Sequence, residues 1–256
     1  MKKLSYMLFI TFVILFSWGV LVKITGVPRY ILPSPTSVFE TLWRERYLIT
    51  DHAMITLIEV ILGLLLGASL GAMTAITIAY SRWLRLWLRP VLLISQALPV
   101  FVLAPLLTLW FGYGLTSKVL MATLIIFFPV TSAFFDGLMR TPVSYLDLAK
   151  TMDASRWKMM IHIRIPAAIP SLGTGVRLAA VYAPIGAVIG EWVGSSKGLG
   201  YLMLLANGRV KTDLMFASMI VLAGLSVILY FVVNAILKGY EKEGDLNQPQ
   251  REHLMQ

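Results

Sequence analysis

The sequence predicts an all-α integral membrane protein with six transmembrane helices. Three observations lead to this fold class: 58% of the 256 residues are hydrophobic, only 14% are charged, and the apolar residues form long runs separated by short polar connections. Soluble domains average ~25% charged residues, whereas about 20 apolar residues in a row can cross a bilayer as a helix. The net charge of +9 is spread between the apolar runs, which favours contact with anionic lipid headgroups over contact with nucleic acid.

Six apolar runs qualify as spans, and they place residues 1–240 in one transmembrane domain, followed by a polar cytoplasmic tail, 241–256. The first run lacks a small-x-small cleavage site, so we expect an uncleaved helix rather than a signal peptide. Lys and Arg are more frequent in the segments that this arrangement puts inside, so we expect both termini in the cytoplasm. The predicted spans are 4–22, 53–80, 91–111, 118–137, 168–193 and 214–237.

A short helix is expected over 36–44, between the first two spans. The second span carries Gly63, Gly67 and Gly71 at intervals of four residues. Small residues at this interval share one helix face and let a neighbouring helix approach closely, which matters in lipid, where packing replaces the hydrophobic driving force. We therefore predict a helix-packing seam within the subunit, with a role in substrate contact as the alternative.

Two charged residues lie inside predicted spans, Glu59 in the second and Arg177 in the fifth. A charged side chain at membrane depth needs a partner or water. Counting ~1.5 Å per residue from the expected span ends places the two residues at similar depth. We expect them to form an intramembrane pair that stabilises the bundle, with substrate contact by Arg177 as the alternative.

Prolines interrupt the middle of the chain. A basic, Trp-bearing turn covers 81–90, and the third span that follows carries Pro99 and Pro105. Proline removes a backbone donor and clashes with the preceding turn, so we expect this span to be broken or kinked. The fourth span contains Pro129 and ends in the most polar internal segment of the chain, 140–170.

The segment 140–170 is basic, with two aspartates, Asp147 and Asp153. An excess of Lys and Arg in a short connection is typical of the cytoplasmic side, and apolar residues at helical spacing predict two short amphipathic helices that meet around Asp153. On charge alone, an ordinary interfacial loop of some other membrane protein remains open. The basic residues are Arg140, Lys150, Arg156, Lys158 and Arg164.

The spacing within this segment resembles a known motif. Asp147-Leu148-Ala149, three residues, Asp153, nine residues and Ile163-Arg164-Ile165-Pro166 is similar to the EAA loop of permease subunits of bacterial ATP-binding-cassette (ABC) importers: Glu-Ala-Ala, three residues, Gly, nine residues, Ile-x-Leu-Pro. The resemblance implies an importer-permease (MetI-like) core whose cytoplasmic coupling helix docks onto a separate ATPase. The implied coupling residues are Leu146, Asp147, Ala149, Lys150, Asp153, Ala154, Ile163 and Pro166.

Two positions depart from that motif. Asp147 replaces Glu and keeps the charge, while Asp153 replaces a Gly that would permit a sharp break between helices. Asp can instead accept a hydrogen bond from a free backbone N–H, so we expect Asp153 to cap the second short helix. In the implied contact with the ATPase, Ala149 allows close approach, Leu146 is an apolar anchor and Asp147 supplies a charge.

Residues 191–213 are Gly-rich and are expected to form a hairpin-like external re-entry before the last span. Sulfonate and taurine permeases share its Glu-x-x-x-x-Ser-x-Gly-Leu-Gly-Tyr frame. The longer stretch EWVGSSKGLGYLMLLANGRVKTDLMFA is similar to permeases for the pyrimidine precursor of thiamine. The resemblance implies import of hydroxymethylpyrimidine or its formylamino relative, with sulfonate, taurine or nitrate as alternatives.

No stretch fits the nucleotide-binding frame GxxxxGK[ST]. We therefore expect no enzyme activity or bound cofactor in this chain. The resemblance implies that ATP and Mg²⁺ are held by two copies of a separate ATPase subunit. A second permease copy, forming a homodimer, and a periplasmic or lipid-anchored binding protein complete the implied assembly in the bacterial inner membrane. The expected docking surface for the binding protein is 29–46 and 194–212.

The chain has no cysteine, and its three histidines lack metal-ligand spacing, so a metal site is not expected. A secondary transporter, the alternative from a different class, would show inverted repeats, and no convincing internal repeat is present.

Overall fold

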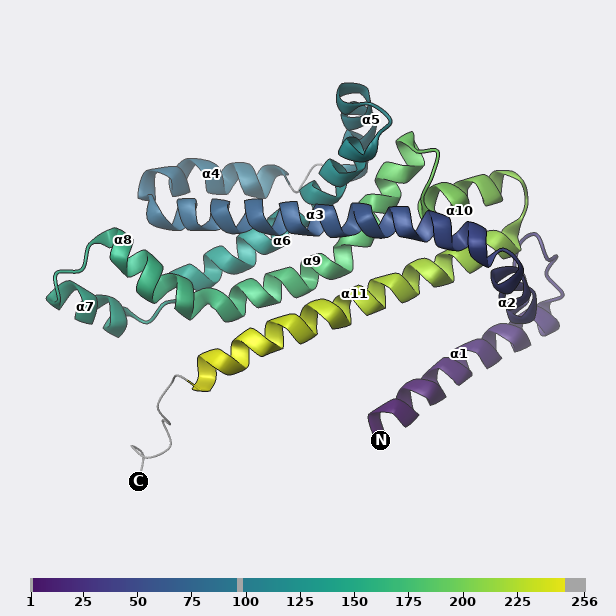
Figure 1. The fold of residues 1–256 in the computed structure, drawn as a ribbon, viewed down its shortest axis with the longest axis horizontal. Coiled ribbons are helices and arrows are strands. Elements are labelled where there is room, and N and C mark those ends of the chain that lie inside the picture. The colour runs from purple at the N-terminus through teal and green to yellow at the C-terminus, as the bar shows by residue number, and fades with distance from the viewer. Residues whose placement is uncertain (1, 96–98, 247–256) are drawn as a thin grey trace.

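A computed structural model describes residues 2–95 and 99–246 of the chain, and these residues are organised as helices (Figure 1). The all-α fold class predicted from composition is confirmed. In chain order the helices are α1 (Lys2–Thr25), α2 (Pro35–Arg44), α3 (Arg46–Tyr80), α4 (Arg82–Ser95), α5 (Val100–Phe111), α6 (Leu115–Met139), α7 (Val143–Thr151), α8 (Arg156–Met159), the π-helical turn η1 (Met160–Arg164), α9 (Ile165–Gly194), α10 (Leu199–Gly208) and α11 (Thr212–Leu246).

The bundle is built on α6, which packs against both α3 and α9. The helices come close because small residues line the contacts: Ala122 of α6 and Ala179, Ala183 and Ala187 of α9 are fully buried. Four segments within the described residues are long and apolar enough to cross a membrane: 46–80, 115–139, 156–194 and 212–239. They contain the second, fourth, fifth and sixth predicted spans.

The third predicted span, 91–111, is divided between two helices. The first of them, α4, begins at Arg82 in the basic turn and lies along α3 (Figure 1). The second, α5, starts after Pro99, whose backbone is extended, and projects from the bundle. Residues 96–98 lie outside the described part. The break agrees with the expectation from the prolines.

Helix α1 contains the first predicted span and stands apart from the central helices in Figure 1. Its described contacts include Trp18, whose ring stacks on Phe216 of α11 at 5.7 Å between centroids. At the other end of the chain, α11 continues to Leu246, past the predicted domain limit at 240. Residues 247–256 of the predicted tail lie outside the described residues.

The two ends of the bundle differ. One, called here the α7 end, carries α7, α8 and the turn between α3 and α4; the other, the α10 end, carries α2 and α10 (Figure 1). At the α10 end, α2 starts as the sequence predicts: Pro35 occupies its first turn, and the Ser34 side chain accepts a hydrogen bond from the Ser37 N–H. The Gly-rich segment expected to re-enter contains the short helix α10, between α9 and α11.

Candidate functional site

The segment that connects α6 to α9 forms two short helices, α7 and α8, joined by a tight turn at Asp153. Asp153 has φ of 53°, in the left-handed region. Its N–H donates to the Lys150 carbonyl at 3.0 Å, and the Ala154 N–H donates to the Ala149 carbonyl at 2.9 Å. These two bonds form a Schellman motif, which normally has glycine at the left-handed position. Asp153 therefore adopts the backbone conformation that a glycine would favour.

The expectation that Asp153 caps the second short helix is wrong. Ser155 is the N-cap of α8, and its side chain accepts a hydrogen bond from the Lys158 N–H at 3.3 Å. Asp153 instead ends α7, two residues too early to reach the first turn of α8. Asp153 and Ser155 both precede α8 and both have side chains that can cap a helix. The backbone conformation decides which of the two reaches the first turn.

The sequence placed the junction with the next span at Pro166, but α8, η1 and α9 form one continuous helical rod. At the π-helical turn, the Ile165 N–H reaches back five residues to the Met160 carbonyl. A wider turn leaves room for the ring of Pro166, which cannot donate and would crowd the preceding turn of a regular α-helix. Ile163 is half-buried, and Pro166 is exposed in the first turn of α9.

Helix α7 has an outer and an inner face. Tyr145, Leu148 and Met152 lie three and four residues apart, so they share one face, and their exposed fractions are 42, 61 and 75%. Ala149 is buried at 6% exposure and Leu146 is half-buried. Ala149 therefore packs within its own chain, and Leu148 is more exposed than Leu146.

Two of the predicted coupling residues, Asp147 and Lys150, form an ion pair with each other. The Lys150 Nζ and Asp147 Oδ1 atoms are 2.8 Å apart, and both side chains are more than half exposed. An exposed pair of this kind contributes only ~0–1 kcal/mol. Asp147 is therefore available to an external partner at little energetic cost, while Ala154, in the turn, is half-buried.

The glycines of α3 lie where this helix packs against α6. A Cβ atom built on Gly63 would come within 2.5 Å of the Ala122 Cβ, and one built on Gly67 within 2.8 Å of the Ile126 Cβ. On Gly71, the nearest atom would be the Phe127 carbonyl oxygen at 2.9 Å. These distances are below normal carbon contacts, so the spacing between the helices depends on the absence of side chains at the three positions.

The expected pairing of Glu59 with Arg177 is not what the structure shows. The Glu59 carboxylate accepts from Lys118 Nζ at 2.8 Å, with side-chain exposures of 0 and 7%, while Arg177 Nε donates to Asn234 Oδ1 of α11 at 3.0 Å. Gly190 lies against the Lys118 backbone. Arg177 comes thirteen residues earlier in α9 (190 minus 177), which separates it from the Glu59 pair by about 20 Å along the helix.

A polar cluster beside this pair was missed by the sequence reasoning. It closes the start of α10, whose first N–H groups have no partner within the helix. The Gly198 N–H donates to His52 Nδ1 at 2.9 Å, the Leu199 N–H to Thr56 Oγ1 at 2.8 Å, and the N–H groups of Gly200 and Tyr201 to Glu191 Oε2.

Glu191 and Thr56 are also bonded to each other, at 2.6 Å. Gly198 has φ of 115°, and a Cβ atom there would overlap the Glu191 carboxylate at 2.2 Å. The glycines of the Glu-x-x-x-x-Ser-x-Gly-Leu-Gly-Tyr frame therefore let the chain wrap around a buried carboxylate. In the sequence, this frame was the only sign of the polar cluster. It indicated a resemblance to sulfonate and taurine permeases and did not predict these hydrogen bonds.

A bundle of long apolar helices packed on small residues, with a polar helix pair at one end, is the architecture of a multi-pass membrane protein. The part of the chain that the structure describes contains no cluster of His, Cys, Asp or Glu that could hold a metal ion. The fold is shared with a chain of the inward-facing MetNI methionine ABC transporter, with a TM-score of 0.68, 16% identity, and coverage of 77% of this chain and 97% of that chain.

The family model described as binding-protein-dependent transport system inner membrane component matches residues 63–243. The chain belongs to this family: it is the permease subunit of an ABC importer, a multi-pass inner-membrane protein that works with a separate ATPase subunit and a binding protein. A probable ABC transporter permease of Haemophilus influenzae is 49% identical over 90% of this chain and 94% of its own length.

Relatives with named cargo are more distant. The riboflavin transport permease RibX of Chloroflexus aurantiacus is 37% identical over 86% of this chain and 82% of its own. The formylaminopyrimidine transport permease ThiX of Halalkalibacterium halodurans is 33% identical over 86% and 88%. The resemblance identified from the EAA-like spacing is confirmed at the level of the family.

Proposed function

We propose that the outer face of α7 is the surface through which the ATPase subunit moves this permease. The observation that carries the proposal is the exposure of Tyr145, Leu148 and Met152 on a helix whose end is fixed by the Schellman motif at Asp153. Coupling requires contacts that differ between two states of the partner, and a rigid helix transmits such differences to α6 and α9.

The test compares Leu148→Glu with Leu148→Met in the complex with its ATPase. Leu148→Glu puts a charge on the proposed contact surface and is expected to abolish both solute uptake and stimulation of ATP hydrolysis, while the subunit still inserts. Leu148→Met keeps an apolar side chain of similar volume and is expected to retain uptake. Asp147→Lys is expected to act like Leu148→Glu, whereas Ala149→Trp would disturb packing within the permease itself.

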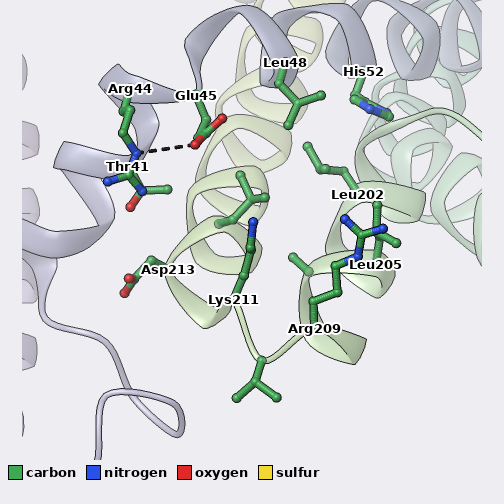
Figure 2. Close-up of a pocket in the computed structure, with 13 residues that line it drawn as sticks. Thr41, Arg44, Glu45, Leu48, His52, Leu202, Leu205, Arg209, Lys211 and Asp213 are labelled. Atoms are coloured by element: carbon green, nitrogen blue, oxygen red, sulfur yellow. Dashed lines mark hydrogen bonds and ion pairs between the residues drawn. The ribbon is translucent and has the colours of Figure 1, made fainter.

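The α10 end supports docking of the binding protein. A cavity of about 420 Å³ lies between α2 and the start of α3 on one side and α10 with the start of α11 on the other. Figure 2 shows Arg44 and Glu45 on one wall and Arg209, Lys211 and Asp213 facing them. Most of its lining residues belong to the two expected segments, 29–46 and 194–212, and the others are Leu48, His52, Asp213 and Leu214. Both termini would then lie in the cytoplasm, on the side of α7.

The proposed cargo is a small nitrogen heterocycle. The pyrimidine precursor of thiamine is the first candidate, from the similarity of residues 191–217, and riboflavin is the second, because RibX is the more similar of the two relatives with such cargo. Relatives named for aliphatic sulfonates and taurine are 32 and 26% identical. The proposed assembly contains two permease copies and two ATPase copies, a stoichiometry that native mass spectrometry of the purified complex measures.

Uptake of labelled hydroxymethylpyrimidine, riboflavin and taurine into vesicles that contain the full importer tests the cargo. We expect saturable, ATP-dependent uptake of the pyrimidine, competed by its formylamino relative. Uptake of taurine alone would contradict the proposal. Accumulation by the permease without its ATPase would contradict the family function itself and indicate a secondary transporter.

A further inference from the structure

A basic cavity of about 310 Å³ lies at the α7 end, between the α3–α4 turn and the α7–α8 segment. It is a site that the importer function does not explain, because it lies on the side of α7 that faces the permease rather than on the proposed ATPase surface. Its lining includes Leu146 from the inner face of α7 and Met160 from η1. All the charged residues of its lining are basic: Arg82, Arg85, Lys150, Arg156 and Arg164.

Most of this charge is uncompensated. Among the residues that the structure describes, only Lys150 of the five forms an ion pair, with Asp147. The Arg85 guanidinium donates to the carbonyls of Ile78 and Ala79 at the end of α3, at 3.3 and 2.8 Å. The nearest described partner of Arg164 is the Met139 sulfur, 3.9 Å from Nη1.

The neighbouring cations disfavour one another. Partial burial lowers the pKa of Arg85, and the charges of Arg164, Arg82 and Arg89 lower it further. An anion bound in the cavity would offset the repulsion between these arginine side chains. Guanidinium groups are suited to phosphate oxygens, because their planar N–H groups donate in pairs.

Exposed aromatic side chains around the cavity indicate that the anion is a lipid headgroup. Trp83, Trp87 and Trp157 are 67, 65 and 52% exposed, and Trp157 packs edge-on against Tyr80, which lines the cavity, at 5.6 Å. Exposed Trp and Tyr gather at the level of the lipid headgroups. On α4, Arg82, Arg85 and Arg89 follow at intervals of three and four residues, so they share a face, as in helices that lie in the membrane interface.

We propose that this cavity binds the phosphate of an anionic phospholipid headgroup, which bridges α4 and the α7–α8 segment. The cavity has arginines on both of its walls, and it lies beside exposed Trp side chains, a residue type that is enriched at the level of the lipid headgroups. A bound headgroup would hold the inner face of α7 against the end of α3. In this proposal, the lipid stabilises the position of the α7–α8 segment relative to α3.

The experiment adds phosphatidylglycerol or phosphatidylcholine to the delipidated full importer and counts bound lipids by native mass spectrometry. The test pair is Arg156→Gln with Arg164→Gln. The matched control is Arg140→Gln with Lys158→Gln, which removes the same charge from the same end of the bundle outside the cavity lining. Arg82→Gln, on the opposite wall, tests the same site without changing α8 or η1.

We expect the unmodified importer to prefer phosphatidylglycerol. The test pair should bind this lipid about thirtyfold more weakly, because each of its two lost basic residues contributes ~1 kcal/mol near a lipid surface. Arg82→Gln should lose several-fold, and the control pair less than twofold. An equal loss in the control pair would reduce the effect to general surface charge and overturn the proposal.

Two further outcomes would also overturn it. Full competition by millimolar inorganic phosphate would assign the cavity to a free anion. Binding by the isolated permease that disappears when the ATPase assembles would assign it to an acidic side chain of that partner. Since binding is measured without transport, the result is independent of the proposed cargo and of the Leu148 experiment.

Discussion

The buried pair of Glu59 and Lys118 offers a quantitative test of the structure. Lys118→Met removes the ammonium group and keeps most of the side-chain volume, leaving the carboxyl groups of Glu59 and Glu191 as neighbours without their cation. Breaking a buried pair from one side typically lowers the free energy of unfolding by ~3–5 kcal/mol. For a chain of this size, that corresponds to a fall in Tm on the order of 10 °C.

The double variant Glu59→Gln with Lys118→Met removes both charges and should recover most of the loss, because replacing both partners can be nearly neutral. The assay is the loss of the monodisperse complex on heating, followed by size-exclusion chromatography. A second cycle, Glu59→Gln with Arg177→Gln, should show additive effects, because contacts so far apart do not couple. Coupling between Glu59 and Arg177, with none between Glu59 and Lys118, would refute the placement of α6 against α3.

Three further predictions concern the helix contacts. Gly67→Ala should lower the free energy of unfolding by ~1–3 kcal/mol through overpacking against Ile126; Gly224→Ala, which has open space, should be neutral or stabilising, and the two Tm values decide. Asp153→Gly should raise the Tm by a few degrees, because it relieves ~1 kcal/mol of left-handed strain, whereas Asp153→Ala should give no gain. Thr56→Val should cost ~1–3 kcal/mol by leaving the Leu199 N–H unbonded. Its control Thr123→Val removes a buried hydroxyl without a described partner and should cost less; equal losses would contradict the assigned hydrogen bonds.

Features set by local sequence could be predicted. The apolar runs predicted which segments form the long helices, though not where each begins, and the charge and spacing of 140–170 predicted the two short helices α7 and α8. The four-residue spacing of Gly63, Gly67 and Gly71 placed them on one face of α3. In each case, the deciding interactions lie within a few turns of one helix.

Contacts between distant segments could not be predicted in this way. Depth was counted from expected span ends, but α3 starts at Arg46, seven residues before the expected 53, and α6 at Leu115, three before 118. The fourth predicted span therefore begins at Lys118 itself, at an expected membrane edge, although Lys118 lies buried in the first turn of α6. The bond between Thr56 and Glu191 joins residues 135 positions apart, and nothing local to either residue identifies the other.

The length of α3 has a mechanical consequence. Its 35 residues, with no proline, extend about 52 Å, well beyond the ~30 Å of hydrocarbon. One extremity holds the start of α10 through His52 and Thr56, and the other reaches the basic cavity at Ala79 and Tyr80. Because α3 is a continuous helix with contacts at both of its ends, we expect it to move as a rigid unit. We therefore expect a displacement at the α7 end to reach the α10 end through movement of α3 as a whole, without a relay of side-chain rearrangements.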